Sequence, residues 1–158
     1  MVKVRLYQSQ DNSVLARLFT ETVRAINSAD YSPEQVEAWA SNPPDLERWR
    51  GQLAGRIVLV AEDDSEILGF ATFEANGHLD HLYVHSRFQG MGVASLLLRK
   101  IEGQAASLGI NQIYTEASVT ARPFFEHSGF RMVTPQRVEV DGVPFLNYRM
   151  EKLLTKSN

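Results

Sequence analysis

The segment Val84–Ala94, with the sequence VHSRFQGMGVA, constrains the fold of this chain more than any other. It reads as the end of a strand, a short loop with two glycines, and the start of a long amphipathic helix. Such a loop presents consecutive backbone N–H groups, and the helix behind it adds the positive end of its macrodipole. Glycine at positions 90 and 92 removes the Cβ atoms that would keep a pyrophosphate away from the backbone. The loop therefore predicts a site for a phosphate-rich ligand.

Three kinds of glycine loop fit such a site. A Walker loop needs Lys-Ser or Lys-Thr at the start of the helix, where this chain has Val93 and Ala94. A dinucleotide fingerprint, G-x-G-x-x-G, has its third glycine at the position where this chain has Ser95. Such a fingerprint also lies near the start of its sheet, whereas several predicted strands precede this loop. The third pattern, Q/R-x-x-G-x-G/A, is matched at every specified position by Gln89, Gly92 and Ala94. In this respect the loop resembles the acetyl-coenzyme A loop of the GNAT N-acetyltransferases. A strand-to-helix turn without a ligand is the alternative.

The composition of the chain narrows the possible classes of protein and of partner. The 158 residues predict a single domain over residues 1–158, and 44% hydrophobic residues are ordinary for a soluble globular protein. Without cysteine there is no disulfide, thiolate zinc site or cysteine nucleophile, and we expect no metal. No stretch approaches the roughly 20 apolar residues of a membrane span, so we expect a cytoplasmic protein with no membrane partner. A net charge of -3 disfavours nucleic acid and is compatible with a cationic amine as substrate.

Hydrophobic periodicity and turn signals predict the elements. Ser32, followed by Pro33 and by Gln35 three residues after it, forms a helix start with a capping box, and Asp141-Gly142 indicates a hairpin. We expect helices at about 13–28, from 33 to before 43, at 46–53, 94–108 and 121–128, and strands at 2–6, 57–61, 67–73, 79–84, 110–117, 130–140 and 143–151. This order predicts an α/β fold with a mixed, mostly antiparallel central sheet flanked by helices.

The order of elements is also that of the GNAT family, so the resemblance covers nearly the whole chain. A second motif agrees: the family pattern N-x-x-A-x-x-F-Y-x-x-x-G-F falls on residues 118–130, with Ala121, Phe124 and Gly129-Phe130 at matching positions. The chain is most similar to a small bacterial subgroup. This chain also departs from the family pattern at two positions. The tyrosine that protonates the leaving thiolate in many members falls at Phe125, and the asparagine falls at Ser118.

The resemblance implies acetyl-CoA as cosubstrate, and it implies a backbone N–H near Tyr83 or Val84 facing the thioester carbonyl. The residues expected to bind the cofactor are Leu82, Tyr83, Val84, Gln89, Gly90, Met91, Gly92, Val93, Ala94, Ser118 and Phe124.

Acetyl transfer to an amine also requires proton acceptors, because an ammonium group cannot attack. Strand alternation puts His78 and Asp80 on one face and His81 and Tyr83 on the other. We expect Asp80 to accept the amine proton through a water, with His78 tuning or replacing it. Surface or salt-bridged roles are the alternatives for these residues and for Glu116, which lies near the end of a later strand.

Because Phe125 cannot protonate the leaving thiolate, another side chain must do so or the thiolate must leave unassisted. Tyr31 is the leading candidate for this general acid, since the family fold brings the first helical region over the thioester. Trp39 lies in the same region and is either core or part of the acceptor site. The expected function is transfer of an acetyl group from acetyl-CoA to a primary amine of a small molecule or peptide, by direct attack. The alternative is a non-catalytic acyl-CoA sensor or interaction module. A monomer or a homodimer is expected.

Overall fold

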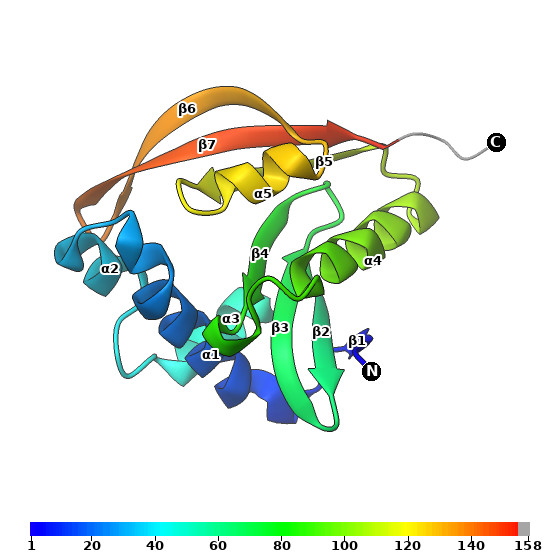
Figure 1. The fold of residues 1–158 in the computed structure, drawn as a ribbon, viewed down its shortest axis with the longest axis horizontal. Helices are drawn as coiled ribbons and strands as arrows, with labels where there is room; N and C mark the ends of the chain where they lie inside the picture. The colour runs from blue at the N-terminus through cyan, green and yellow to red at the C-terminus, as the bar shows by residue number, and fades with distance from the viewer. Residues whose placement is uncertain (155–158) are drawn as a thin grey trace.

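The computed structural model describes residues 1–154; residues 155–158, which belong to the expected single domain, lie outside the described residues. Seven strands and five α-helices fill this range (Figure 1). The strands are β1 Lys3–Leu6, β2 Ile57–Asp63, β3 Glu66–Phe73, β4 Leu79–Val84, β5 Gln112–Ser118, β6 Arg131–Val140 and β7 Val143–Leu153. The helices are α1 Asn12–Ala25, α2 Pro33–Trp39, α3 Leu46–Leu53, α4 Val93–Ser107 and α5 Arg122–His127, with 3-10 turns at Ser9–Asp11, Asn27–Ala29 and Ser86–Phe88.

The expected elements are all present, with small shifts at their ends. The first helix stops at Ala25, three residues short of the expected Ser28, and a separate 3-10 turn follows it. The Ser32 capping box of α2 forms as predicted, with Gln35 N–H donating to Ser32 Oγ at 3.1 Å. At the tip of β6–β7, Asp141 and Gly142 both have positive φ, which is the backbone of a two-residue hairpin turn. No helix within residues 1–154 is long and apolar enough to span a membrane.

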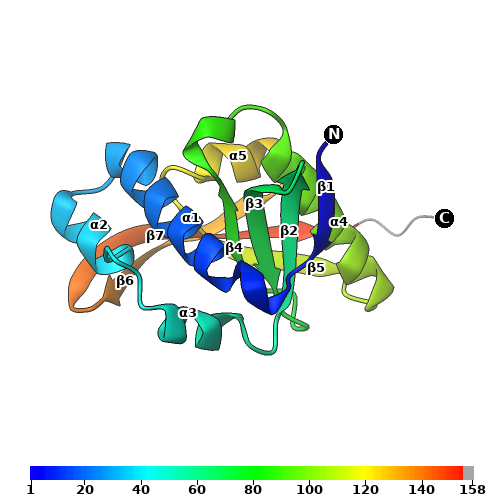
Figure 2. The ribbon, with the colours of Figure 1, turned by 90° about the horizontal axis from the view of Figure 1, so that it is seen from below.

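The apolar strand β2 explains how the helices are layered. Its alternate residues Val58 and Val60 pack with α1 and α3, while Leu59 and Ala61 pack with α4. A strand buried on both faces reads as a continuous apolar run, as residues 57–61 do. The sheet β1-β2-β3-β4 therefore lies between α1 and α3 on one side and α4 on the other, as Figure 2 shows from below.

The sheet is mostly antiparallel, as expected, but it is split in two. Strands β1-β2-β3-β4 form one antiparallel sheet and β5-β7-β6 the other. The two meet through a single parallel bridge between His78 and Tyr114, reinforced by Thr115 Oγ1, which donates to the carbonyl of Leu79 at 2.8 Å. Beyond this point β4 and β5 run apart. The opening between them is where a ligand can enter the sheet.

A β-bulge interrupts β4 at Asp80. Leu79 pairs with Phe73 and His81 with Thr72, so Asp80 has no partner on β3. A bulge re-aims the side chains on one side of it relative to simple alternation. His81 and Tyr83 do share a face, as expected. His78 lies just before β4, at the bridge to Tyr114.

Candidate active site

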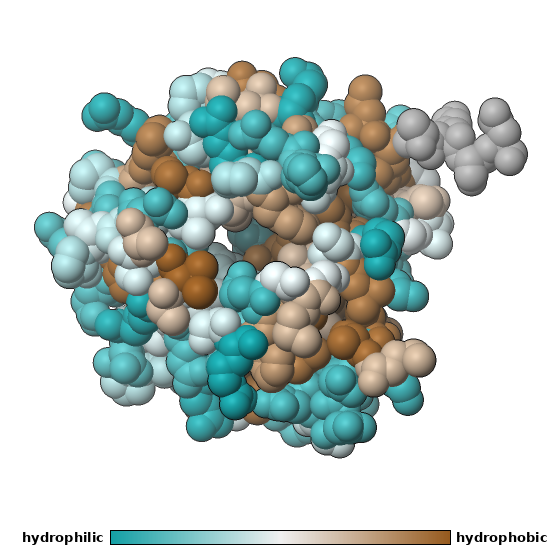
Figure 3. All heavy atoms as spheres, viewed as in Figure 1, coloured by the Kyte–Doolittle hydropathy of each residue, from teal (hydrophilic) through white to brown (hydrophobic). Residues whose placement is uncertain are grey.

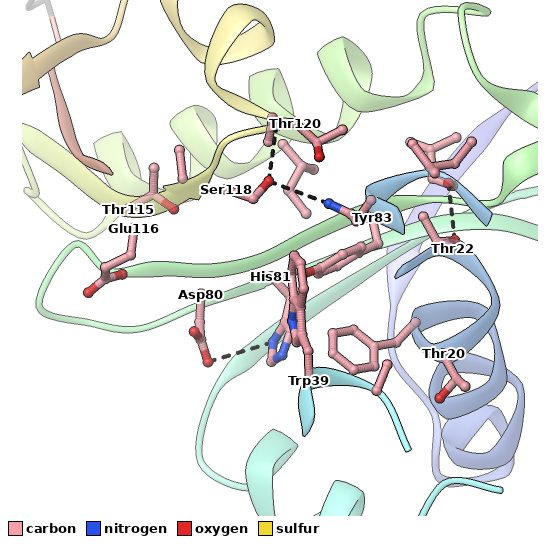
Figure 4. Close-up of a pocket in the computed structure, with 18 of the residues that line it drawn as sticks. Thr20, Thr22, Trp39, Asp80, His81, Tyr83, Thr115, Glu116, Ser118 and Thr120 are labelled. Carbon is pink, nitrogen blue, oxygen red and sulfur yellow. Dashed lines mark hydrogen bonds and ion pairs between the residues drawn. The ribbon is translucent and has the colours of Figure 1, made fainter. Parts of the chain in front are cut away.

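A cavity of about 980 Å³ occupies the opening between β4 and β5. It is visible as a hollow near the centre of the space-filling view (Figure 3). Thirteen of the fourteen side chains predicted as catalytic or cofactor-binding line it; the exception is Met91, which is not among the lining residues and is 66% exposed. The lining residues come from helices α1 to α5, from strands β4 to β7, and from the loops before α4 and α5; Figure 4 shows part of this lining. Segments far apart in the sequence therefore converge on one site.

The glycine loop is shaped for a phosphate group. Gly90 has φ +74° and Gly92, which caps α4, has φ +81°; neither would meet another atom if it carried a Cβ. Glycine is therefore required here by the backbone conformation, and the space beside it stays open. Within residues 1–154, the backbone N–H groups from Gln89 to Ser95 donate no hydrogen bond. Unpaired N–H groups at the start of a 15-residue helix fit the pyrophosphate of coenzyme A.

The edge of β4 offers further backbone donors. The N–H of His85 donates to the carbonyl of Leu68 at 2.8 Å, which makes these two residues a hydrogen-bonded pair. Bonded and non-bonded pairs alternate along antiparallel strands, so the N–H groups of Leu82 and Val84 point away from β3, toward the opening. By the same alternation, the N–H of Tyr83 points to β3. The carbonyl of Val84 is held by Gln89 Nε2 at 2.6 Å, which joins the glycine loop to the strand.

At the closed end of the opening, five charged side chains form an ion-pair network. Arg56 binds Asp80 and also lies 3.6 Å from Glu74, while His78 Nδ1 lies 2.8 Å from Glu74 and His78 Nε2 lies 2.6 Å from Glu116. Negative and positive groups thus alternate, with Asp80 and Glu116 at the two ends. Both end carboxylates line the cavity, and Figure 4 shows them projecting from β4 and β5.

The network shifts the pKa values of Asp80 and His78. Burial would raise the pKa of Asp80, but the nearby His81, Arg56 and His78 outweigh it and the pKa falls below its ordinary value. The hydrogen bond to Glu116 is the main reason that the pKa of His78 is raised, against the opposing effect of burial. At neutral pH Asp80 is a carboxylate that can accept a proton. His78 has both ring nitrogens engaged, so it is placed to hold the two glutamates.

His81 and Tyr83 differ from the network because they are buried among rings. Burial lowers the pKa of His81 to about 4, so this ring is neutral at physiological pH, and Thr72 Oγ1 lies 2.8 Å from its Nδ1. Burial raises the pKa of Tyr83 well above the usual range, so it keeps its proton. Both rings contact Phe19 of α1 and Phe70 of β3.

Tyr31 lies over the opening, where its hydroxyl bridges two backbone segments. It accepts from the N–H of Val119 at 2.8 Å and donates to the carbonyl of Leu146 at 3.1 Å. Burial raises its pKa. Phe125 lines the cavity but packs in the core, 5.0 Å from Phe130 between ring centroids, and carries no proton to donate. Ser118 Oγ accepts from the N–H of Ala121 at the start of α5.

Sequence reasoning missed Arg56 and Glu74, which hold the network together. Arg56 lies before β2 and Glu74 follows β3, so neither belongs to a recognisable motif. The only available signal was their position at strand ends beside the turn that precedes β4. Glu116, for which a surface or salt-bridged role is the main expectation, is exposed and forms an ion pair with His78.

Comparisons with known proteins agree with this geometry. The family described as acetyltransferase (GNAT) domain matches residues 27–152. The chain is 36% identical to the uncharacterized N-acetyltransferase YafP of Escherichia coli, covering 94% of both chains. It is similar to the crystal structure of a GCN5-related N-acetyltransferase from Rhodopseudomonas palustris, with a TM-score of 0.92 and 32% identity, covering 96% of this chain and 95% of that one.

A more distant structure, the PaiA N-acetyltransferase of Thermoplasma acidophilum in complex with coenzyme A, shares the fold. Its TM-score is 0.76 at 20% identity, covering 97% of this chain and 99% of that one. The family match covers the glycine loop and the opening between β4 and β5, and the two relatives above 30% identity cover 94% and 96% of this chain. This chain belongs to the GNAT acetyltransferase family.

Proposed function

We propose that this protein transfers the acetyl group of acetyl-CoA to the primary amine of a small molecule or peptide, by direct attack of the amine on the thioester. As a GNAT acetyltransferase it uses acetyl-CoA as cosubstrate. One observation carries the proposal. A single cavity joins the bare N–H groups of the glycine loop to a charged network with a carboxylate at each end, Asp80 and Glu116. The first feature suits a pyrophosphate and the second suits an ammonium group.

The reaction makes three demands. The ammonium must lose a proton, the carbonyl oxygen gains negative charge as the C–N bond forms, and the sulfur takes the electron pair as the C–S bond breaks. Acetyl-CoA supplies the activated acetyl group. The side chains and backbone of the cavity must supply the proton acceptor and the donors.

We assign the base to Asp80, acting through a water, because it is ionised at neutral pH and lines the cavity. Arg56 and His78 position the carboxylates around the amine. The N–H groups of Leu82 and Val84 are the backbone donors directed into the opening, and one of them is assigned to the carbonyl oxygen.

The proton for the thiolate is assigned to Tyr31, because Phe125 cannot give one. To act, the Tyr31 hydroxyl would turn its proton from the carbonyl of Leu146 to the sulfur while still accepting from Val119. Unassisted departure beside the positive end of α4 is the alternative route. The expected cytoplasmic location and the monomeric or dimeric state are kept as parts of this proposal.

The test measures release of the coenzyme A thiol with a panel of primary amines, alongside calorimetric binding of coenzyme A. The expected result is thiol release with at least one amine and a matching mass increase of one acetyl group. Tight binding of coenzyme A with no thiol release on any amine would overturn the enzyme and favour the acyl-CoA-binding module.

A further inference from the structure

The acceptor side of the cavity is walled by rings. The cavity is lined by aromatic side chains from α1, α2, α3, β4 and β7 and from the segment before α2. These residues, which we term the aromatic wall, are Phe19, Tyr31, Trp39, Trp49, Tyr83 and Phe145. They form two contacting groups. In one, ring centroids lie 5.2 Å apart between Tyr31 and Trp39 and 6.0 Å between Trp39 and Phe145. In the other, they lie 5.0 Å apart between Phe19 and Tyr83.

The wall faces a site with excess negative charge. The ion-pair network holds three carboxylates against two cations, Arg56 and His78, so it carries one net negative charge even with His78 protonated. Its two ends, Asp80 and Glu116, line the same cavity as the rings. A site that combines aromatic faces with carboxylates is complementary to a cation on an apolar body.

The cavity is also roofed. Tyr31 Oη donates to the carbonyl of Leu146 at 3.1 Å, and Gln35 Nε2 donates to the carbonyl of Pro144 at 2.9 Å. These bonds join the region of α2 to the β6–β7 hairpin, which curves over to it in Figure 1. A roof fixed in this way favours a compact acceptor over an extended peptide, which needs an open groove.

We infer that the acceptor is a small arylalkylamine: a primary ammonium joined by a short alkyl spacer to an aromatic ring. The ammonium lies between Asp80 and Glu116, and the ring lies against Trp39 and its neighbours. This inference rests on the proposed function for its chemistry, but it concerns binding, which can be measured without turnover.

The experiment measures calorimetric binding of three probes to the protein saturated with coenzyme A. Tyramine has the full set of features, n-hexylamine keeps the charge without the ring, and the peptide Tyr-Gly-Gly keeps the ring on a peptide amine. We expect tyramine to bind about 10-fold tighter than either of the others, in line with desolvated cation–π and ring contacts. Equal or weaker binding of tyramine would overturn the inference.

Two variants assign the binding to the residues named. Trp39→Leu keeps apolar volume and should remove the preference for tyramine over n-hexylamine. Glu116→Gln should weaken both amines alike, about 10-fold, because it removes one carboxylate. Coenzyme A affinity should be unchanged in both variants, which shows that they are folded. Should Trp39→Leu fail to fold, the comparison of the three probes on the unmodified protein still decides the inference.

Turnover separates this inference from the proposed function. Tyramine binding with no thiol release on any amine would support the inference and overturn the enzyme. A higher kcat/KM for n-hexylamine or for Tyr-Gly-Gly than for tyramine would leave the enzyme standing and overturn the inference.

Discussion

The two ends of the cavity present different chemical groups, backbone N–H groups at one end and charged side chains at the other. At the α4 end, the glycine loop offers backbone N–H groups, and the side chains there serve mainly to hold the backbone, as Gln89 does with Val84. At the closed end of the β4–β5 opening, the chemistry lies in side chains of five residues from β4, β5 and the segments beside β2 and β3. The first end is contiguous in sequence, whereas the second exists only after folding.

This difference teaches what each end tolerates. Backbone donors need a conformation, so the loop depends on glycine at positive φ and hardly on the identity of its exposed side chains, such as Met91. A network of side chains needs charge balance, so loss of one member leaves a neighbour unpaired. Changes at the α4 end should therefore affect the cofactor alone, and changes at the other end should affect turnover and its dependence on pH.

The largest effect is expected at Gly92. Replacement by Asp places a carboxylate beside the phosphate site and a Cβ at φ +81°, so Gly92→Asp should abolish coenzyme A binding in calorimetry. Gly92→Asn is the matched control, because Asn has the same shape without the charge and tolerates positive φ better than most residues. Unchanged affinity in a folded Gly92→Asp protein would remove the basis of the cofactor assignment.

A smaller effect, confined to turnover, is expected at Asp80. Asp80→Asn keeps the shape and removes the proton acceptor, so turnover at neutral pH should fall by roughly 10²–10⁴, as for a general base. Coenzyme A affinity, measured by calorimetry, should hardly change, because Asp80 lies at the other end of the cavity. If His78→Ala loses the rate while Asp80→Asn keeps it, the histidine has the role assigned to the aspartate.

Tyr31 sharpens the comparison, because its hydroxyl both joins two backbone segments above the cavity and is the proposed acid for the leaving thiolate. Tyr31→Phe removes the hydroxyl that bridges Val119 and Leu146, and as the loss of an acid it should reduce turnover by about 10-fold. It should also remove a high-pH limb from the rate profile. Phe125→Tyr is the companion variant, since it supplies an acid at the family position. Wild-type turnover and pH profile in Tyr31→Phe would show that the thiolate leaves unassisted.

The smallest effect is a pH-dependent contribution to stability from His78. Its pKa is raised above the ordinary 6.5 in the folded protein, mainly by Glu116. The stabilisation is therefore fully present below pH 6.5 and is lost as the pH rises through the raised pKa. Urea denaturation of the wild type and of His78→Asn should show a larger difference at about pH 6 than at about pH 9. An equal difference at both would mean that the network does not hold His78 charged.

Much of the fold could be predicted because its signals are local. The apolar run of β2, the capping box at Ser32 and the hairpin at Asp141-Gly142 each depend on a few neighbouring residues. The bulge at Asp80 could not be predicted, because it is a mismatch of register between β4 and β3 and leaves no mark in either strand alone.

The sequence by itself determined the order of elements and the family, and it predicted the glycine loop as the cofactor end, because such a loop carries its backbone chemistry in consecutive residues. Only the tertiary structure decided the amine end. Arg56 and Glu74 became part of the site because the turns before β2 and after β3 meet beside β4, and His78 joined Glu74 to Glu116 because β4 and β5 touch at a single bridge. Ion pairs between segments far apart in the chain depend on distance in space, and spacing along the sequence does not encode it.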